Sequence, residues 1–299
     1  MDVVTGAFSF TGRYVAARLL ELGREVRTLT RHPQTASPFG PRVEAFPLDF
    51  DPDTLTERLR GADTLYNTYW IRSPRGELTF ERVLDNTTIL LNAAREAGVR
   101  RVVQLSVSNA SRSSTLPYFR GKALAEEALA TSGLSYAIVR PTLVFAPEDV
   151  LVNNIAWLLR RLPLFVVPGS GRYTLQPVAV EDVADLAVSA ALDTEPAVMD
   201  AAGPDIFSFE ELVHLVREAV DSRAAVVHAS PRLALGLSAL TGKLLRDTLV
   251  SRAELAGLMQ GLLTSKAAPT GTRRFADWLR ENADSVGRSY VSERVRNWT

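Results

Sequence analysis

The chain of 299 residues is 46% hydrophobic, which is enough to bury the core of one sizeable domain or of a domain with an appendage. Its 34 basic and 34 acidic residues cancel, so the net charge favours neither nucleic acid nor an anionic membrane as a partner, and a small molecule fits better. The absence of cysteine excludes disulfides, thiol catalysis and thiolate metal sites, and the three histidines lack metal-ligand spacing, so we expect no metal.

The chain opens with a predicted strand, a glycine-rich turn and a helix. Val3 and Val4 are typical of a short buried strand, and apolar residues recur at helical spacing over residues 14–22. The sequence between them, TGAFSFTG, places Gly6 and Gly12 in a strand-to-helix turn. The unpaired backbone N–H groups and the dipole of a helix N-terminus attract phosphate, and glycine allows its close approach.

This turn predicts the pyrophosphate site of a dinucleotide, because it opens the first strand-helix unit of the chain. The predicted cofactor-binding residues of the turn are Gly6, Phe8, Ser9, Phe10, Thr11 and Gly12. Ser9 stands where a third glycine is usual, and its hydroxyl is expected to donate to a phosphate oxygen. The alternative is a glycine turn that only packs a helix on a sheet.

The early start of the first strand leaves no room for a cationic leader and signal-type apolar run, so we expect a cytoplasmic protein. The most apolar region, residues 150–169, is interrupted by asparagines, arginines and a proline, so we expect no membrane span. It predicts an amphipathic helix followed by a strand.

The second strand, VRTLT, ends at Arg31. An acidic residue at this point accepts from both ribose hydroxyls of NAD, whereas a basic residue favours the 2′-phosphate of NADP. Arg31 therefore predicts NADP(H) in preference to NAD(H), with a solvated surface arginine as the alternative. Asp49, at the end of the third strand-like run, is predicted either to contact the adenine or to cap the next helix, and Phe50 is predicted to bind the cofactor.

Strand-like and helical segments alternate along the chain. The further strand-like runs are residues 43–50, 64–70, 101–107, 135–141, 175–180 and 197–203, and the helical ones include residues 54–60 and 84–97. Such alternation implies crossover connections and a parallel sheet. The sequence therefore predicts an α/β protein with a Rossmann-type doubly wound parallel sheet.

Two further segments are mostly helical and do not alternate, namely residues 147–171 and 203–299. They predict a smaller, mostly helical C-terminal lobe that binds substrate. Residues 1–146 and 172–202 are then the NAD(P)-binding domain.

Tyr118 and Lys122 lie four residues apart in a segment predicted to be helical, so their side chains share one face. Because the chain has seven tyrosines and only three lysines, a Tyr-x-x-x-Lys pair is expected by chance only about 0.07 times. A nearby ammonium favours the phenolate and eases proton exchange by a tyrosine near neutral pH. The pair predicts a proton donor, with a plain amphipathic helix face as the alternative.

These motifs resemble the short-chain dehydrogenase/reductase superfamily in its extended and atypical branches, over most of the chain. TGAFSFTG is similar to the TGxxGxxG cofactor loop, YFRGKALAEEAL to the catalytic helix and IVRPTLVFAP to the strand that packs near the nicotinamide. LRRLPLFVVPGSGRYTLQPV and AAGPDIFSFEELVHLVREA are similar to the atypical branch, which includes relatives of the NADPH-binding accessory subunit of respiratory complex I and NmrA-like proteins.

The resemblance implies that Tyr118 is the proton donor and that Lys122 binds the nicotinamide ribose and lowers the tyrosine pKa. Ser108 best matches the residue that hydrogen-bonds the substrate oxygen, and Ser106 is the next candidate. The other implied cofactor contacts are Ser106, Pro141, Thr142 and Val144.

We therefore expect an NADPH-dependent oxidoreductase that passes hydride to a carbonyl or activated double bond of a small, apolar substrate. The apolar character rests on Phe145, Trp157, Leu158 and Phe165, which a plain core would also explain. One alternative is a non-catalytic NADP(H)-binding sensor or assembly protein. A second is an NAD(P)-dependent nucleotide-sugar epimerase or dehydratase, although Ser108 precedes Tyr118 by fewer residues than in those enzymes. No pattern indicates an oligomeric state.

Overall fold

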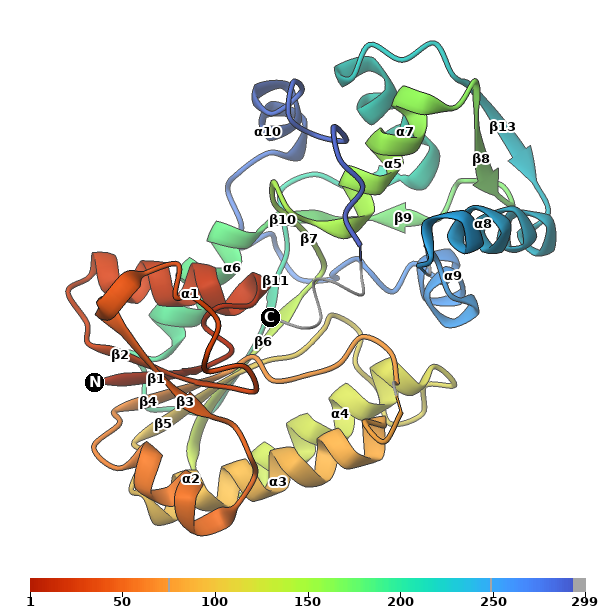
Figure 1. Cartoon of the computed structure of the whole chain (residues 1–299). Helices are drawn as coiled ribbons and strands as arrows, with labels where there is room; N and C mark the ends of the chain where they lie inside the picture. Colours follow the sequence, from red (N-terminus) through yellow and green to blue (C-terminus); the bar gives the residue numbers. More distant parts are fainter. Residues whose placement is uncertain (75, 248, 293–299) are drawn as a thin grey trace. The chain divides into compact units, whose positions relative to one another are not determined.

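The chain folds into two compact units (Figure 1). The computed structural model describes residues 1–74, 76–247 and 249–292. The first unit consists of Met1–Pro141 and Val180–Ala201, and the second of Thr142–Ala179 and residues 202–292. The chain therefore passes twice from the first unit into the second.

Within the described residues, a seven-stranded parallel sheet forms the centre of the first unit. Across the sheet the strands are β11 (Ala197–Ala201), β6 (Ser135–Pro141), β5 (Arg101–Leu105), β4 (Thr64–Asn67), β1 (Asp2–Thr5), β2 (Val26–Thr30) and β3 (Val43–Pro47). All neighbouring strands pair in parallel. Val3, Val4 and Val103 are fully buried, as expected of strands covered on both faces. The predicted Rossmann-type parallel sheet is confirmed.

Helices cover both faces of this sheet (Figure 1). They are α1 (Phe10–Glu21), α2 (Pro52–Leu59), α3 (Phe80–Glu96), α4 (Pro117–Ala130) and α6 (Val180–Ala190), and a short 3-10 helix, η1 (Gly40–Arg42), precedes β3. Helix α1 packs with α6, whereas α3 packs with both α2 and α4 on the opposite face. Several predicted site residues lie just after the carboxyl ends of these strands, namely Gly6, Arg31, Asp49 and Ser106.

The starts of α1 and α2 differ in how they are capped. The Asp51 carboxylate accepts a hydrogen bond from the Thr54 backbone N–H at 2.9 Å and caps α2. The alternative in which Asp49 caps this helix is therefore wrong. The Asp49 carboxylate accepts a hydrogen bond from the Arg58 guanidinium at 3.0 Å. Ser9 is the N-cap residue of α1, but its side chain makes no capping hydrogen bond.

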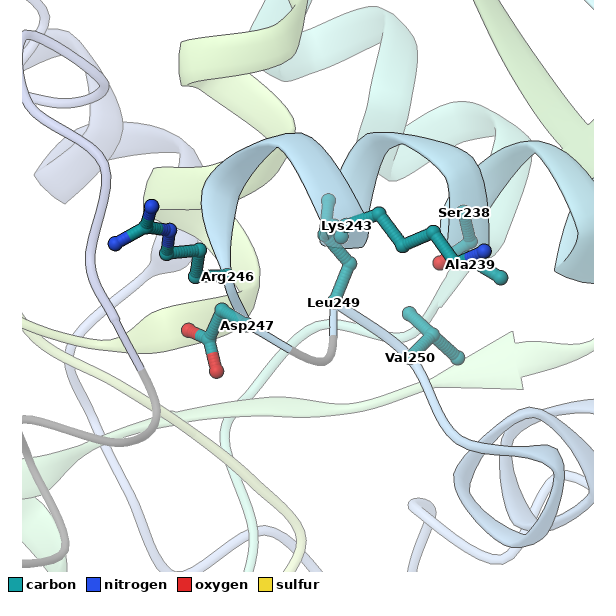
Figure 2. Close-up of a pocket in the computed structure, with 8 residues that line it drawn as sticks. Ser238, Ala239, Lys243, Arg246, Asp247, Leu249 and Val250 are labelled. Carbon is teal, nitrogen blue, oxygen red and sulfur yellow. The ribbon is translucent and has the colours of Figure 1, made fainter.

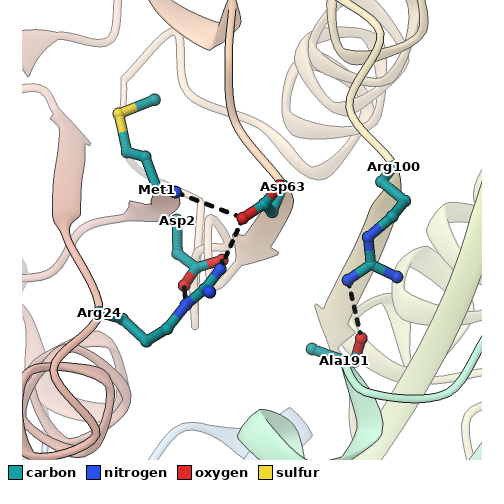
Figure 3. Close-up of polar contacts among 6 residues, drawn as sticks. All are labelled: Met1, Asp2, Arg24, Asp63, Arg100 and Ala191. Atoms are coloured by element: carbon teal, nitrogen blue, oxygen red, sulfur yellow. Dashed lines mark hydrogen bonds and ion pairs between the residues drawn. The ribbon is translucent and has the colours of Figure 1, made fainter.

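Ion pairs join the segments that lead into β1 and β4 (Figure 3). The Arg24 guanidinium donates to the carboxylates of Asp2 and Asp63, both at 2.7 Å, and the amino group of Met1 lies 3.3 Å from Asp63. Asp2 is only 1% exposed, so its charge requires a cationic partner. Arg24 and the amino terminus lower the pKa of Asp63.

The second unit combines helices with short paired strands. Its helices are α5 (Val150–Arg161), α7 (Phe209–Ala219), α8 (Pro231–Leu245), α9 (Arg252–Met259) and α10 (Phe275–Glu281). Its strand pairs are β7 (Leu143–Phe145) with β10 (Pro177–Ala179), β8 (Leu164–Pro168) with β13 (Ala225–Ala229), and β9 (Thr174–Leu175) with β12 (Phe207–Ser208). Residues 150–169 form α5 and β8, as the sequence predicts.

Three expectations differ from the structure of this unit. In the segment 175–180, predicted as one strand of the alternating series, Leu175 lies in β9 and Pro177–Ala179 form β10, which pair within the second unit, while Val180 begins α6. Residues 142–146 and 172–179, assigned by the sequence to the first domain, group with the second unit because β7 pairs with β10. Phe145 is fully buried and Phe165 is 8% exposed, so these two side chains belong to a hydrophobic core rather than to a substrate surface.

Candidate functional site

Gly6 and Gly12 have different structural roles in the turn between β1 and α1. Gly6 has a φ of +69°, a left-handed conformation that glycine adopts without steric cost. A Cβ on Gly12 would lie 2.2 Å from the carbonyl oxygen of Gly6, so α1 begins against a backbone that tolerates no side chain there. Gly6 and Gly12 therefore allow a tight turn that carries no side chain at these two positions.

The Ser9 hydroxyl closes this turn. It donates to the carbonyl oxygen of Gly6 at 2.6 Å, so it is engaged inside the turn instead of donating to a phosphate as the sequence suggests. Phe8 is buried, whereas Phe10 and Thr11 are partly exposed at the start of α1. The first turn of α1 contains no acidic residue, which favours an anion at this end of the helix.

Hydrogen bonds to two buried threonines connect the turn to the neighbouring strands. The Thr5 hydroxyl oxygen accepts from the backbone N–H groups of Thr68 at 2.8 Å and Tyr69 at 3.0 Å. The Thr28 hydroxyl oxygen accepts from the backbone N–H of Ala7 at 2.9 Å. These residues were missed by the sequence analysis, although single threonines inside apolar strands are the signal that points to them. They hold the ends of β1 and β4 and the start of the glycine turn in one arrangement.

Aromatic side chains gather at the ends of β3 and β4. Phe50 has a positive φ of 59°, and its ring centroid lies 4.8 Å from that of Tyr69. The Tyr69 hydroxyl accepts from the Asn86 amide at 3.0 Å. Burial raises the pKa of Tyr69, while Asn86 and the positive charge of Arg31 act in the opposite direction. Tyr69 and Asn86 are therefore additions to the predicted group of Arg31, Asp49 and Phe50.

Tyr118 and Lys122 lie one turn apart on α4 in different surroundings. Lys122 is 4% exposed, and its ammonium donates to the carbonyl oxygen of Leu105 at 2.7 Å and lies 4.7 Å from the ring centroid of Trp70. Tyr118 is partly exposed, and its ring centroid is 6.3 Å from that of Phe80. Burial lowers the pKa of Lys122 to about 7, although Glu126 acts in the opposite direction. The lysine can therefore change its charge near neutral pH.

A buried ion pair involves the next turn of α4. Glu126 is 7% exposed, and its carboxylate accepts from the Arg140 guanidinium at 2.9 and 2.5 Å. The Ser106 hydroxyl donates to the same carboxylate. This bond uses the only proton of the Ser106 hydroxyl. Glu126 was not predicted, because its partners come from β6 and the end of β5.

The remaining predicted residues fall in both units. Ser108 is fully buried, and its backbone N–H donates to the carbonyl oxygen of Pro141 at 2.9 Å. Thr142 and Val144 belong to the second unit, where the Thr142 hydroxyl donates to the carbonyl oxygen of Gln176 at 2.5 Å and Val144 lies in β7. Contact of these residues with the nicotinamide stays a prediction.

Pockets of the second unit lie around α8 and α9. One of about 340 Å³ includes Ser238, Lys243 and Arg246 in its lining (Figure 2), and one of about 680 Å³ is lined by residues between Pro231 and Met259. No predicted site residue lines either of them. Within the part of the chain that the structure describes, no helix has the length and apolar character needed to cross a bilayer. Nor do His, Cys, Asp or Glu side chains of these residues form a group of three or more that could hold a metal ion.

Comparison with known proteins agrees with a nucleotide-binding first unit. A family model described as NAD(P)H-binding matches residues 6–194, which is more than half of the chain. The NADH dehydrogenase (ubiquinone) 1 alpha subcomplex subunit 9, mitochondrial, of Arabidopsis thaliana is 28% identical over 230 residues, covering 73% of this chain and 57% of that protein. The photosystem II assembly factor Ycf39 of Cyanidium caldarium is 26% identical over 193 residues, covering 63% and 60%. The chain thus spans less than two thirds of the length of these relatives.

Solved structures share the fold. The triphenylmethane reductase of Citrobacter sp., complexed with NADP(H), has a TM-score of 0.76 at 18% identity, covering 95% of this chain and 100% of that chain. The UDP-glucose 4-epimerase of Thermus thermophilus, in complex with NAD, has a TM-score of 0.69 at 23% identity, covering 97% and 100%. With the glycine turn, the parallel sheet and the match to the family model, the chain belongs to the NAD(P)H-binding family.

Proposed function

We propose that the protein is an NADPH-dependent oxidoreductase that reduces a carbonyl or activated double bond of a small substrate. The observation that carries this proposal is the burial of Lys122 one turn from the partly exposed Tyr118 on α4. Burial of a lysine ammonium costs free energy of folding, so a buried lysine indicates a functional site, and a pKa of about 7 suits an ammonium that assists proton transfer. A plain surface helix would not bury this side chain.

The first unit fits NADP(H). The left-handed Gly6 and the absence of space for a Cβ at Gly12 are consistent with a turn that lets a pyrophosphate approach the start of α1. Arg31 is exposed just after β2, where it would bind the 2′-phosphate, and Phe50 and Tyr69 would border the adenine. The further cofactor contacts that we propose are Phe8, Ser9, Phe10, Thr11, Asp49, Ser106, Pro141, Thr142 and Val144.

In the proposed mechanism, the chemistry that NADPH would supply when bound is hydride donation to the substrate carbon. Tyr118 donates its proton to the substrate oxygen, which Ser108 holds by a hydrogen bond. The ammonium of Lys122 stabilises the resulting phenolate, and it would also bind the nicotinamide ribose. The carbonyl oxygen of Leu105 and the Trp70 ring hold this ammonium at the end of β5.

Apolar side chains near Tyr118 support an apolar substrate. Phe80 and Trp70 are partly exposed, their ring centroids lie 6.3 Å apart, and Phe80 also contacts Tyr118 edge to face. We therefore propose Phe80 and Trp70 as the apolar side chains near the substrate, in place of the core residues Phe145 and Phe165. We propose that the first unit binds the cofactor and that the second unit contributes to substrate binding. A cytoplasmic location stays a prediction.

A non-catalytic role as an NADP(H)-binding sensor or assembly protein is the second candidate. It is favoured by the names of two relatives, a subunit of NADH dehydrogenase and a photosystem II assembly factor. A nucleotide-sugar epimerase has weaker support, because similarity to the epimerase structures at these identities reflects the fold alone. A screen of ketones, enones, quinones and aldehydes, measured as loss of NADPH absorbance, separates an enzyme from a cofactor-binding protein that oxidises NADPH no faster than buffer.

Arg31 is expected to determine the choice of cofactor. NADPH should bind at least about tenfold more tightly than NADH, which corresponds to about 1.4 kcal/mol, and Arg31→Ala should remove most of this difference by taking away the partner of the 2′-phosphate. Titration calorimetry with NADPH and with NADH measures the difference between the two affinities. Arg60→Ala, at another exposed arginine of the first unit, is the control. Equal affinities in the unchanged protein would contradict the assignment.

Glu126 is expected to set the pH range of activity. Lys122 carries its charge below a pKa of about 7 and loses it above, so the rate of NADPH oxidation should fall as pH rises through 7. The carboxylate of Glu126 raises this pKa, with Arg140 as its counterion, so Glu126→Gln should move the fall to lower pH. The matched control is Glu127→Gln, because Glu127 is exposed and pairs with Arg112. An unshifted profile in a folded Glu126→Gln variant would exclude this role.

A further inference from the structure

Helix α8 of the second unit presents apolar side chains to solvent. Leu233, Leu237 and Leu240 are 56%, 41% and 67% exposed, and spacings of four and three residues place them on one side of the helix. Ala234 and Gly242, by contrast, are buried. We call the side formed by the three leucines the leucine face. A solvent-facing helix surface is normally polar, so a contiguous apolar face of this kind indicates a binding surface.

Positive charge surrounds the leucine face. Residues 222–253 contain five cations, Arg223, Arg232, Lys243, Arg246 and Arg252, and one acidic residue, Asp247. Asp247 is only 8% exposed, accepts a hydrogen bond from the Tyr290 hydroxyl at 2.9 Å and lines a pocket together with Lys243 and Arg246. The zero net charge of the whole chain conceals this local excess.

The cations are spread along the helix instead of meeting at one point. Arg232 is exposed near the start of α8, and Lys243 and Arg246 are exposed at its end. Figure 2 shows the Lys243 side chain running back along α8 toward Ser238, whereas Arg246 leaves the helix in the opposite direction. Within the described residues, none of these three cations has an ion-pair partner. A single phosphate could not engage all of them, but an extended anionic surface could.

We propose that α8 binds the surface of an anionic phospholipid bilayer, with the leucine face entering the interfacial region and the flanking cations contacting lipid phosphates. The combination of exposed leucines and exposed cations on one 15-residue helix fits such a surface. A second copy of the chain fits less well, because a twofold contact through α8 would bring the same cations toward one another. The proposal concerns peripheral binding and does not depend on the proposed enzymatic function.

Cosedimentation of the full chain with vesicles tests the proposal. Vesicles of phosphatidylcholine containing one third phosphatidylglycerol should bind the protein at least about tenfold more strongly than pure phosphatidylcholine, with binding weakened by salt. The double variant Leu237→Gln, Leu240→Gln should lose at least about tenfold in affinity, because its apolar contact with the interface is removed. Arg232→Gln with Lys243→Gln should abolish most of the preference for the anionic lipid.

The control is Leu192→Gln in the first unit, since Leu192 is 82% exposed but lies outside α8. The Leu192→Gln variant should bind vesicles as strongly as the unchanged protein. All variants should have the same melting temperature as the unchanged protein. The proposal is overturned if the α8 variants bind as well as the control, or if the unchanged protein does not prefer anionic vesicles. The proposal is also overturned if the unchanged protein does not bind vesicles and light scattering shows that it is a dimer, whereas the leucine double variant is a monomer.

Discussion

Tyr118→Phe should lower the turnover of NADPH with a carbonyl substrate by about a hundredfold to ten-thousandfold, the contribution of a positioned general acid. The affinity for NADPH should stay nearly unchanged, because only the ionisable oxygen is removed and the ring keeps its contact with Phe80. Lys122→Ala should reduce both quantities, since the ammonium is proposed to assist the phenol and to bind the cofactor ribose. Steady-state kinetics and nucleotide titration of the same preparations measure the two effects separately.

Tyr136→Phe is the control, because Tyr136 is a partly buried tyrosine of β6 that packs against the core of the first unit. It should leave both turnover and affinity unchanged. Turnover that survives in Tyr118→Phe would refute the assignment of Tyr118 as the acid. If no carbonyl compound is reduced by the unchanged protein and Tyr118→Phe is silent in every assay, the non-catalytic role replaces the enzyme.

Gly12→Ala should destabilise the protein by about 3 kcal/mol and abolish NADPH binding. The added Cβ would lie 2.2 Å from the carbonyl oxygen of Gly6 and 3.3 Å from the backbone nitrogen of Ala7, so α1 must move away from the turn. The turn would then lose the shape that we propose for pyrophosphate binding. Urea denaturation gives the free energy of unfolding, and nucleotide titration of the folded fraction gives the affinity.

Gly236→Ala is the matched control, because Gly236 also lies inside a helix but a Cβ there would meet no atom within 4 Å. This variant should raise the free energy of unfolding by up to about 1 kcal/mol, the difference in helix propensity. A Gly12→Ala variant as stable as the unchanged protein, with normal NADPH affinity, would show that the turn adapts to a side chain.

Much of the first unit and part of its site follow from the sequence alone. The strand, glycine turn and helix at the start, and the placement of Tyr118 and Lys122 on one helical face, depend on spacings of a few residues. The parallel sheet follows from the alternation of strands and helices, because parallel neighbours need crossover connections. In these cases the determining interactions are local, so periodicity and turn residues are sufficient to predict them.

Only the tertiary structure shows what each side chain contacts. Ser106 donates to Glu126, twenty residues further along the chain, because the end of β5 meets α4. Residues 175–180 resemble a strand of the main sheet, yet Leu175 and Pro177–Ala179 pair within the second unit, since strand pairing depends on distant partners.

Whether the side chains of a helix are buried also depends on the tertiary structure. The spacing of Leu233, Leu237 and Leu240 would predict a buried helix face, but the structure leaves these leucines exposed. The same periodic pattern suits a core helix and a helix that binds an external surface. The sequence therefore determines that α8 has an apolar side, whereas the packing of the rest of the second unit decides that this side faces outward.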